Sequence, residues 1–119
     1  MTAHAALPER LRDVEQIEDV MTAPTPALAA DLRRLEGDIL ILGVGGKMGP
    51  TLARLAKRAA PDKRVVGVAR FSDTAVRSRL EEAGIETIRC DLLDRAAVED
   101  LPKLENVVFM AGRKFGTAG

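Results

Sequence analysis

The stretch ILILGVGGKMG, residues 39–49, decides the fold of this 119-residue chain. Its first four residues are all apolar, which is typical of a short strand buried on both faces of a sheet. Its last seven residues form a glycine-rich turn, and a helical pattern begins directly after it at Pro50. A buried strand, a glycine turn and a helix in this order predict the first unit of a fold built on parallel strands.

The residues that follow repeat this alternation of strand and helix. Short apolar runs predict further strands at 64–69, 85–90 and 106–111, and helical patterns lie at 50–60, 72–83 and 94–101. The order β-α-β-α-β-α-β predicts an α/β fold with a Rossmann-type, doubly wound parallel sheet. A complete sheet of this type has strand order 3-2-1-4-5-6, and this chain supplies the first four strands. We therefore expect a partial Rossmann domain over residues 38–119, truncated after the fourth strand.

Residues 1–37 are rich in alanine and in charged residues, and they predict a helical N-terminal extension. Apolar residues recur there at roughly helical spacing and predict a first helix with Pro8 near its start: Leu11, Val14, Ile17 and Val20. A second helix should begin with Thr25 as N-cap and Pro26 as first helical residue, and Gly37 should stop it. We expect the extension to pack on the main domain, and a dimerisation arm is the alternative.

Composition bears on the partners and the location of the chain. Its 18 basic and 18 acidic side chains cancel, which gives no electrostatic reason to expect nucleic acid or an anionic membrane. The single cysteine, Cys90, rules out an intrachain disulfide and is expected to be a small core residue. The N-terminus lacks the apolar segment of a secretory signal, and apolar runs such as residues 39–42 are too short to span a bilayer. We therefore expect a cytoplasmic protein, and we assign no metal ligands.

The glycine loop, residues 43–49, has the chemistry of a phosphate-binding turn. Gly43, Gly46 and Gly49 follow the spacing G-x-x-G-x-x-G, whereas G-x-G-x-x-G is not completed because position 48 is methionine. Unpaired amides at a helix N-terminus attract phosphate, and glycines let it approach the backbone. The candidate cofactor contacts are Gly43, Gly45, Gly46, Lys47, Met48 and Gly49. The alternative is a plain strand-to-helix turn, which would need fewer glycines.

Two other nucleotide-binding loops fit the sequence less well. A P-loop needs a hydroxyl residue after its lysine, but Met48 follows Lys47. Methyltransferases that use adenosylmethionine usually carry an acidic residue at the end of the second strand, where this chain has Arg70.

Arg70 occupies the position at which a Rossmann protein places its ribose-reading residue, about 20 residues beyond the loop. An arginine suits the 2′-phosphate of NADP, so Arg70 favours NADP slightly. The alternative is a solvated arginine at the strand exit.

Three stretches resemble a known family: the glycine loop, the run Cys90-Asp91-Leu92-Leu93-Asp94 after the third strand, and Val107-Val108-Phe109-Met110-Ala111-Gly112 at the fourth. Over residues 38–117 the chain resembles the N-terminal half of extended short-chain dehydrogenases, the NAD-dependent epimerase/dehydratase family. The resemblance implies an NAD(P) cofactor, with Asp91 at the adenine amino group and Leu92 beside it. It also implies that Ala111 and Gly112 lie along the adenosine and ribose side of the cofactor.

The sequence departs from this family's pattern in its catalytic residues. In the family a Ser or Thr and a Tyr-x-x-x-Lys pair come after the fourth strand, and the tyrosine acts as general acid and base. The present chain contains no tyrosine, so we assign no catalytic residue. We interpret the chain as the NAD(P)-binding portion of an epimerase/dehydratase-like oxidoreductase, with the catalytic segment absent from this chain. The alternative is a stand-alone, non-enzymatic NAD(P)-binding module or sensor.

The fourth predicted strand raises the question of self-association. In the order 3-2-1-4-5-6 the fourth strand is interior, so without a fifth strand its outer edge would be unpaired. Residues 106–111 contain neither proline nor a charged side chain, the usual protections of an exposed edge. We therefore expect that copies of this chain can associate through this edge.

Overall fold

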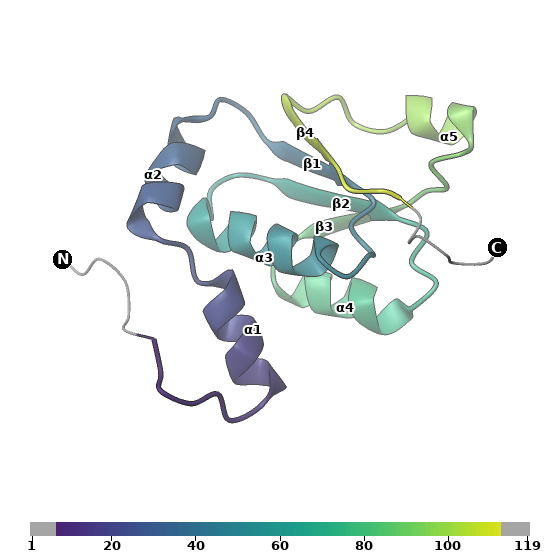
Figure 1. Ribbon diagram of the computed structural model, residues 1–119. Helices are drawn as coiled ribbons and strands as arrows, with labels where there is room; N and C mark the ends of the chain where they lie inside the picture. The colour runs from purple at the N-terminus through teal and green to yellow at the C-terminus, as the bar shows by residue number, and fades with distance from the viewer. Residues whose placement is uncertain (1–6, 113–119) are drawn as a thin grey trace.

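The computed structural model describes residues 7–112 and contains a four-stranded sheet flanked by helices (Figure 1). The strands are β1 (Ile39–Leu42), β2 (Val65–Ala69), β3 (Glu86–Arg89) and β4 (Asn106–Phe109). The helices are α1 (Val14–Thr22), α2 (Pro26–Arg34), α3 (Gly49–Ala59), α4 (Thr74–Glu82) and α5 (Arg95–Glu99). All neighbouring strands pair in parallel, in the order β3-β2-β1-β4. This is the order predicted for the first four strands of a Rossmann sheet, so the predicted fold class is confirmed.

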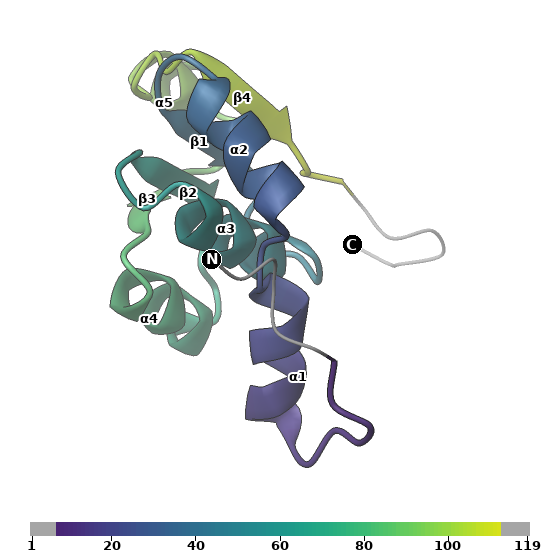
Figure 2. The ribbon, with the colours of Figure 1, turned by 90° about the vertical axis from the view of Figure 1, so that its left-hand side faces the viewer.

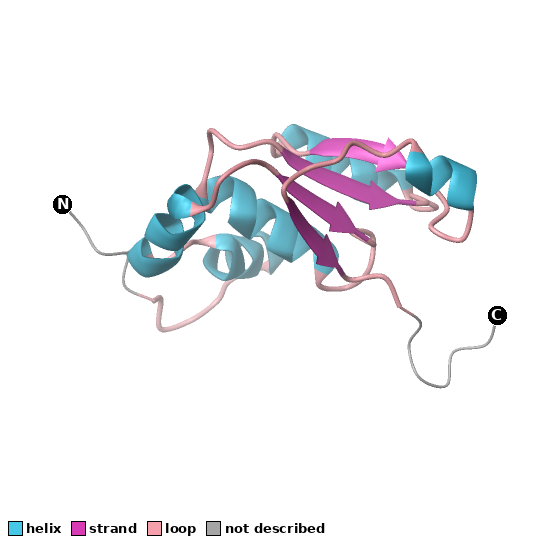
Figure 3. Cartoon of the chain, turned by 90° about the horizontal axis from the view of Figure 1, so that it is seen from above, coloured by secondary structure: helices cyan, strands magenta, loops and turns pink. Residues whose placement is uncertain are grey.

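The side chains of the central strands alternate between two hydrophobic clusters, one on each face of the sheet. Ile39 and Ile41 of β1 belong to the cluster that contains side chains of α3 and α4. Leu40, between them, packs in the cluster that receives side chains from α5. Successive strand residues point to opposite faces, which explains this division. Helices therefore cover both faces of the sheet (Figure 3), and the chain changes faces on its way from β3 to β4.

The helices of the described residues are short, and the longest of them, α3, has 11 residues. Within residues 7–112, no helix has the length and the apolar character that crossing a bilayer would require.

The prediction that the first helix starts near Pro8 is wrong, because α1 begins at Val14. The Asp13 carboxylate accepts a hydrogen bond of 2.8 Å from the Gln16 amide and caps the helix there. The residue before Pro8 is Leu7, whose side chain has no oxygen that could cap a helix.

The two N-terminal helices pack against α3 (Figure 2). Glu18 of α1 forms an ion pair of 2.9 Å with Arg54 of α3. The Arg58 guanidinium donates a 2.8 Å hydrogen bond to the hydroxyl of Thr22, which is buried at the end of α1. Helix α2 begins as predicted, with the Thr25 hydroxyl accepting a bond from the backbone at N3. These contacts join the extension to the same helix that follows the glycine loop.

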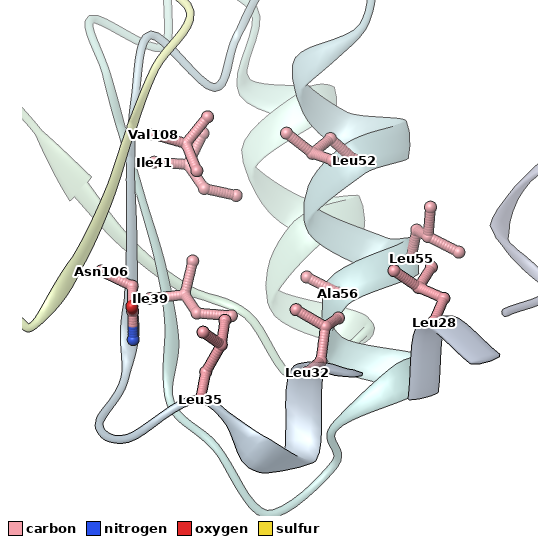
Figure 4. Close-up of a pocket in the computed structure, with 10 residues that line it drawn as sticks. All are labelled: Leu28, Leu32, Leu35, Ile39, Ile41, Leu52, Leu55, Ala56, Asn106 and Val108. Carbon is pink, nitrogen blue, oxygen red and sulfur yellow. The ribbon is translucent and has the colours of Figure 1, made fainter. Parts of the chain in front are cut away.

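An apolar groove lies between α2 and α3, above β1 and β4, with a volume of about 160 Å³ (Figure 4). It is lined by Leu28, Leu32, Leu35, Ile39, Ile41, Leu52, Leu55, Ala56, Asn106 and Val108. The amide of Asn106 is engaged there, because its Nδ2 donates a 2.8 Å hydrogen bond to the Glu36 carbonyl. The lining contains no charged side chain, so the groove offers no counter-charge to a phosphate.

Candidate functional site

The candidate site lies where the strands end at one edge of the sheet. Leu42 is the Cα partner of both Val68 on β2 and Phe109 on β4, so β1, β2 and β4 finish at nearly the same level. Ala69 pairs in turn with Arg89 of β3. The segments after these strands therefore meet along one edge, which we call the carboxyl edge. In open α/β sheets ligands bind in the crevice at this edge, where the strand order changes direction.

Gly43, the first residue after β1, is fixed by two structural constraints. Its φ of +87° lies in the left-handed region, which residues with a side chain rarely adopt. A Cβ placed on Gly43 would also collide with Ala111, since it would lie 2.8 Å from the Ala111 Cβ. The amides of Gly43 and Val44 both donate to the carbonyl of Val68, at 2.8 and 3.0 Å. The loop therefore begins as a tight turn folded back over β2.

Close packing continues from Val44 to the start of α3. A Cβ on Gly49 would overlap the backbone of Val44, so only glycine lets the helix begin this close to the loop. The Val44 side chain is completely buried, and it packs on Gly67 in the middle of β2. A Cβ on Gly67 would lie 2.9 Å from a methyl carbon of Val44. Gly67 lies outside the predicted site motifs, although a glycine inside an apolar strand often marks a close approach of two segments.

The middle of the glycine loop is open, unlike its two ends. Gly45 and Gly46 are exposed, and a Cβ placed on Gly46 would meet no atom of residues 7–112 within 4 Å. A Cβ on Gly45 would lie 3.3 Å from that of Ala69, so the loop passes beside the end of β2. Lys47 and Met48 are also exposed. The predicted loop residues thus include two structural glycines, Gly43 and Gly49, and an exposed centre.

In the described part of the chain, the N-terminus of α3 has no side-chain cap. Its N-cap residue, Met48, makes no capping hydrogen bond. Side-chain oxygens cap each of the other helices among the described residues, namely those of Asp13, Thr25, Asp73 and Asp94. The first amides of a helix carry partial positive charge and need acceptors. A phosphate beside Gly46 would supply such acceptors, and the open centre of the loop leaves room for it.

Arg70 follows β2 directly, and its side chain is exposed at the carboxyl edge. Among residues 7–112 it forms no ion pair. The Ala69 carbonyl just before it accepts a 2.9 Å hydrogen bond from the Cys90 amide, which ties the end of β2 to the segment after β3. The next residue, Phe71, is buried and has a φ of +53°. No sequence pattern predicted this conformation.

The segment after β3 carries the predicted adenine contact. Asp91 is exposed, and its Oδ1 accepts a 2.9 Å hydrogen bond from the Leu93 amide. Leu92 is partly buried and packs against the α5-side cluster. Asp94 caps α5 by accepting from the Ala97 amide at 3.3 Å. The run from 90 to 94 therefore combines a helix cap with an exposed carboxylate at the carboxyl edge.

Cys90 is buried, in agreement with the prediction of a small core residue. Burial raises the pKa of the Cys90 thiol above its ordinary value, and the neighbouring carboxylates of Asp94 and Asp91 raise it further. The protonated thiol is therefore favoured, and a thiolate role is disfavoured.

The residues after β4 close the other side of the edge. The Met110 amide donates a 2.8 Å hydrogen bond to the Leu42 carbonyl, which continues the pairing of β4 with β1. Ala111 is half-buried against Gly43, and Gly112 is exposed. The structure thus brings the predicted residues to one edge: the glycine loop from β1, Arg70 from β2, Asp91 from β3, and Ala111 with Gly112 from β4.

Comparison with known proteins identifies the family to which the chain belongs. The family model described as the NAD dependent epimerase/dehydratase family matches residues 39–118. The chain belongs to this family. A search of the curated proteins and a search of the solved structures found no match to the chain. The family resemblance predicted from the sequence is therefore confirmed.

Membership of the epimerase/dehydratase family implies that the ligand is a nicotinamide dinucleotide. The residues at the carboxyl edge fit such a group. Gly43 and Gly49 allow a compact turn, and within residues 7–112 the space at Gly46 is open and the N-cap of α3 makes no side-chain hydrogen bond. The 119 residues contain no tyrosine, so the Tyr-x-x-x-Lys pair of the family is not among them.

Proposed function

We propose that the chain binds the pyrophosphate of NAD(P) at the centre of the glycine loop, as the cofactor-binding part of an epimerase/dehydratase-like oxidoreductase. The observation that carries this proposal is the open space at Gly46 in front of the uncapped N-terminus of α3. The amides of Gly49 and Thr51 would donate to the phosphate oxygens, since Pro50 has no N–H and the Leu52 amide donates to the Met48 carbonyl at 3.0 Å. Lys47 and Met48 follow Gly46 in the loop, and both are exposed.

The other predicted residues would hold the two ends of the adenosine half. Asp91 would accept a hydrogen bond from the adenine amino group, with Leu92 beside the ring. Ala111 and Gly112 would lie along the adenosine and ribose, where small side chains leave space. Support comes from their positions after β3 and β4 at the same edge as the loop.

The arginine after β2 supports a slight preference for NADP. Arg70 is exposed, lies beside the loop end of β2 and forms no ion pair within residues 7–112. Its planar donor group would pair with the 2′-phosphate, which NAD lacks.

Replacing Gly46 by valine tests the proposed pyrophosphate site. The space around Gly46 is open and its φ is not left-handed, so Gly46→Val should fold normally. The valine side chain would occupy the place of the phosphate, and we expect a severe loss of NAD(P) affinity in calorimetry. Unchanged affinity in a correctly folded Gly46→Val variant would refute the site.

A second candidate function is a stand-alone, non-enzymatic NAD(P)-binding module or sensor. The 119 residues contain no tyrosine to carry family-type acid–base chemistry, and this is compatible with both candidates. The two candidates differ in the coding sequence after Gly119. An open frame that encodes a Ser and a Tyr-x-x-x-Lys pair supports the oxidoreductase, whereas a stop codon supports the module. The cytoplasmic location stays a prediction in either case.

We also propose that β4 mediates self-association. In the described part of the chain β4 pairs only with β1, so its outer side has no strand partner. Val107 and Phe109 are 55% and 69% exposed, and they lie beside Leu40 and Leu42 on the α5 side of the sheet. Val108 faces the apolar groove on the opposite side. A second copy that adds its own edge strand would pair the free backbone groups and cover these side chains.

A further inference from the structure

Phe71 adopts a backbone conformation that aromatic residues rarely have. Its φ is +53°, and within residues 7–112 it is the only residue other than glycine with a positive φ. Asparagine and glycine enter this region at low cost, whereas a bulky side chain is strained there. Strained residues of this kind persist when the surrounding structure over-determines them, and they cluster at ligand sites. Phe71 directly follows Arg70, the residue that we propose reads the ribose.

Burial of the ring explains why the strain is tolerated. Phe71 is 9% exposed and belongs to the cluster formed by β1, α3 and α4, in which Leu80 is also buried. The left-handed turn lets the ring enter this cluster while Arg70, one residue earlier, stays exposed. The ring thus fixes the chain immediately beyond Arg70.

The same ring also engages the next arginine along the chain. The guanidinium of Arg77 lies 5.4 Å from the centre of the Phe71 ring, within range of a cation–π interaction. Its Nε donates a 2.9 Å hydrogen bond to the Thr87 hydroxyl, and it lies 3.8 Å from the Glu81 carboxylate. Arg77 is therefore occupied by α4 and β3, whereas Arg70 is available to a ligand.

We propose that Phe71 is a positioning residue for cofactor discrimination: its buried ring holds the turn after β2 so that Arg70 meets the 2′-phosphate of NADP. This inference rests on the proposed function, because it requires a dinucleotide at the glycine loop and Arg70 at its ribose. Phe71 itself touches no cofactor. Loss of the ring lets the turn take other conformations, so Arg70 contacts the phosphate for a smaller part of the time.

The test compares NADP and NAD affinities, measured by calorimetry, for the wild-type chain and three variants of Phe71. Phe71→Gly removes the ring and relieves the backbone strain, and Phe71→Asn removes the apolar anchor while tolerating the left-handed backbone. Phe71→Leu keeps an apolar anchor. We expect the NADP-to-NAD affinity ratio to fall about tenfold in the glycine and asparagine variants, the loss of one charge-assisted contact. The leucine variant should stay within about threefold of wild type, and NAD affinity should change little in all three.

Arg70→Ala separates this inference from the proposed function. In the Arg70→Ala background, Phe71→Gly should leave the affinity ratio unchanged, because the ring acts through Arg70. A ratio that falls in Arg70→Ala but not in Phe71→Gly or Phe71→Asn overturns the role of Phe71 and leaves the proposed cofactor site standing. If the wild-type chain binds neither dinucleotide, both proposals fail. Should Phe71→Gly not fold, Phe71→Asn and Phe71→Leu provide the same comparison.

Discussion

Gly43 and Ala111 touch so closely at the ends of β1 and β4 that a Cβ on Gly43 would lie 2.8 Å from the Ala111 Cβ. The contact joins the start of the glycine loop to the segment that closes the other side of the carboxyl edge. Because of this contact, Gly43 is needed for the fold itself, whether or not a ligand is bound. Gly46, three residues later, has no such neighbour among the described residues. The two glycines of this motif therefore have different roles: Gly43 is required by the fold, and Gly46 leaves space for a ligand. Substitutions at the two positions can distinguish these roles.

Gly43→Ala should destabilise the chain substantially. The left-handed backbone costs a residue with a side chain about 1–2 kcal/mol, and the crowding against Ala111 adds to this. Folded domains are stable by only about 5–15 kcal/mol, so urea unfolding should show a clear shift of the midpoint. Gly46→Ala is the matched control, because its side chain enters open space, and its midpoint should stay near wild type. Equal midpoints for wild type and Gly43→Ala would contradict the role of the contact.

Gly67 and Val44 should behave as a coupled pair. Gly67→Ala places a methyl group 2.9 Å from Val44, and overpacking of this kind costs about 1–3 kcal/mol. Val44→Ala makes room for that methyl group, although it leaves a cavity of its own. We expect the double variant to be less destabilised than the sum of the two single variants, with a coupling of about 0.5–3 kcal/mol. Strict additivity in urea unfolding would show that the two residues do not press on each other.

The sequence predicts the parts of this structure that local patterns determine. The run 39–42 predicts β1 with its observed bounds, because a strand buried on both faces leaves an uninterrupted apolar signal. Thr25 predicts the start of α2 because a capping hydroxyl acts within three residues. The run 85–90 overestimates β3, which spans Glu86–Arg89, because a half-exposed strand has weak boundaries. Periodicity and caps thus predict the order and the type of the elements.

The details that shape the site depend on contacts between distant segments. Gly67 is required by the way Val44 packs back over β2: a glycine inside an apolar strand indicates a close approach, but β2 alone does not identify Val44 as the partner. The left-handed backbone of Phe71 has no local signal either, since glycine or asparagine normally marks that conformation. The uncapped start of α3 is visible in the sequence as a missing capping residue before Pro50. The structure shows that the other described helices have side-chain caps, so the uncapped start of α3 is an exception.

Arg70→Ala should weaken NADP binding more than NAD binding, since only NADP has a 2′-phosphate that loses its partner. The arginine side chain is exposed, so the difference should shrink as the salt concentration rises. Calorimetry with both cofactors at two salt concentrations measures it. Arg79→Ala removes another exposed arginine from α4 and serves as the control for net charge. Equal losses for the two cofactors would show that Arg70 does not read the ribose.

The ion pair between Arg64 and Glu86 predicts a pH dependence of stability. Two hydrogen bonds of 2.8 and 3.0 Å join the side chains, and they lower the pKa of Glu86 below its ordinary value of 4.5. A carboxylate with a lowered pKa in the folded state stabilises that state above pH 4.5, and the contribution is lost as the pH falls through the lowered pKa.

Glu86→Gln should therefore be slightly less stable than wild type at neutral pH and equally stable in acid. The effect is small because both side chains are about half exposed. Urea unfolding at several pH values follows the difference, and Glu99→Gln, which breaks the more exposed pair with Arg95, is the control. A difference that grows as the pH falls would have the wrong sign and would exclude this explanation.

Within residues 7–112 the outer side of β4 has no strand partner, and the last prediction is that the chain associates with itself at high concentration. Covering one large apolar side chain contributes roughly 1.5–3 kcal/mol, and Phe109 and Val107 are both more than half exposed. Light scattering should therefore rise with protein concentration, and thermal melts should depend on it. Val107→Lys places a charge beside the edge and should keep the chain monomeric. Leu93→Lys is the matched control, because Leu93 is 92% exposed but lies in the segment after β3. A wild-type chain that stays strictly monomeric and well folded at high concentration would reject association through β4 and favour a self-contained module.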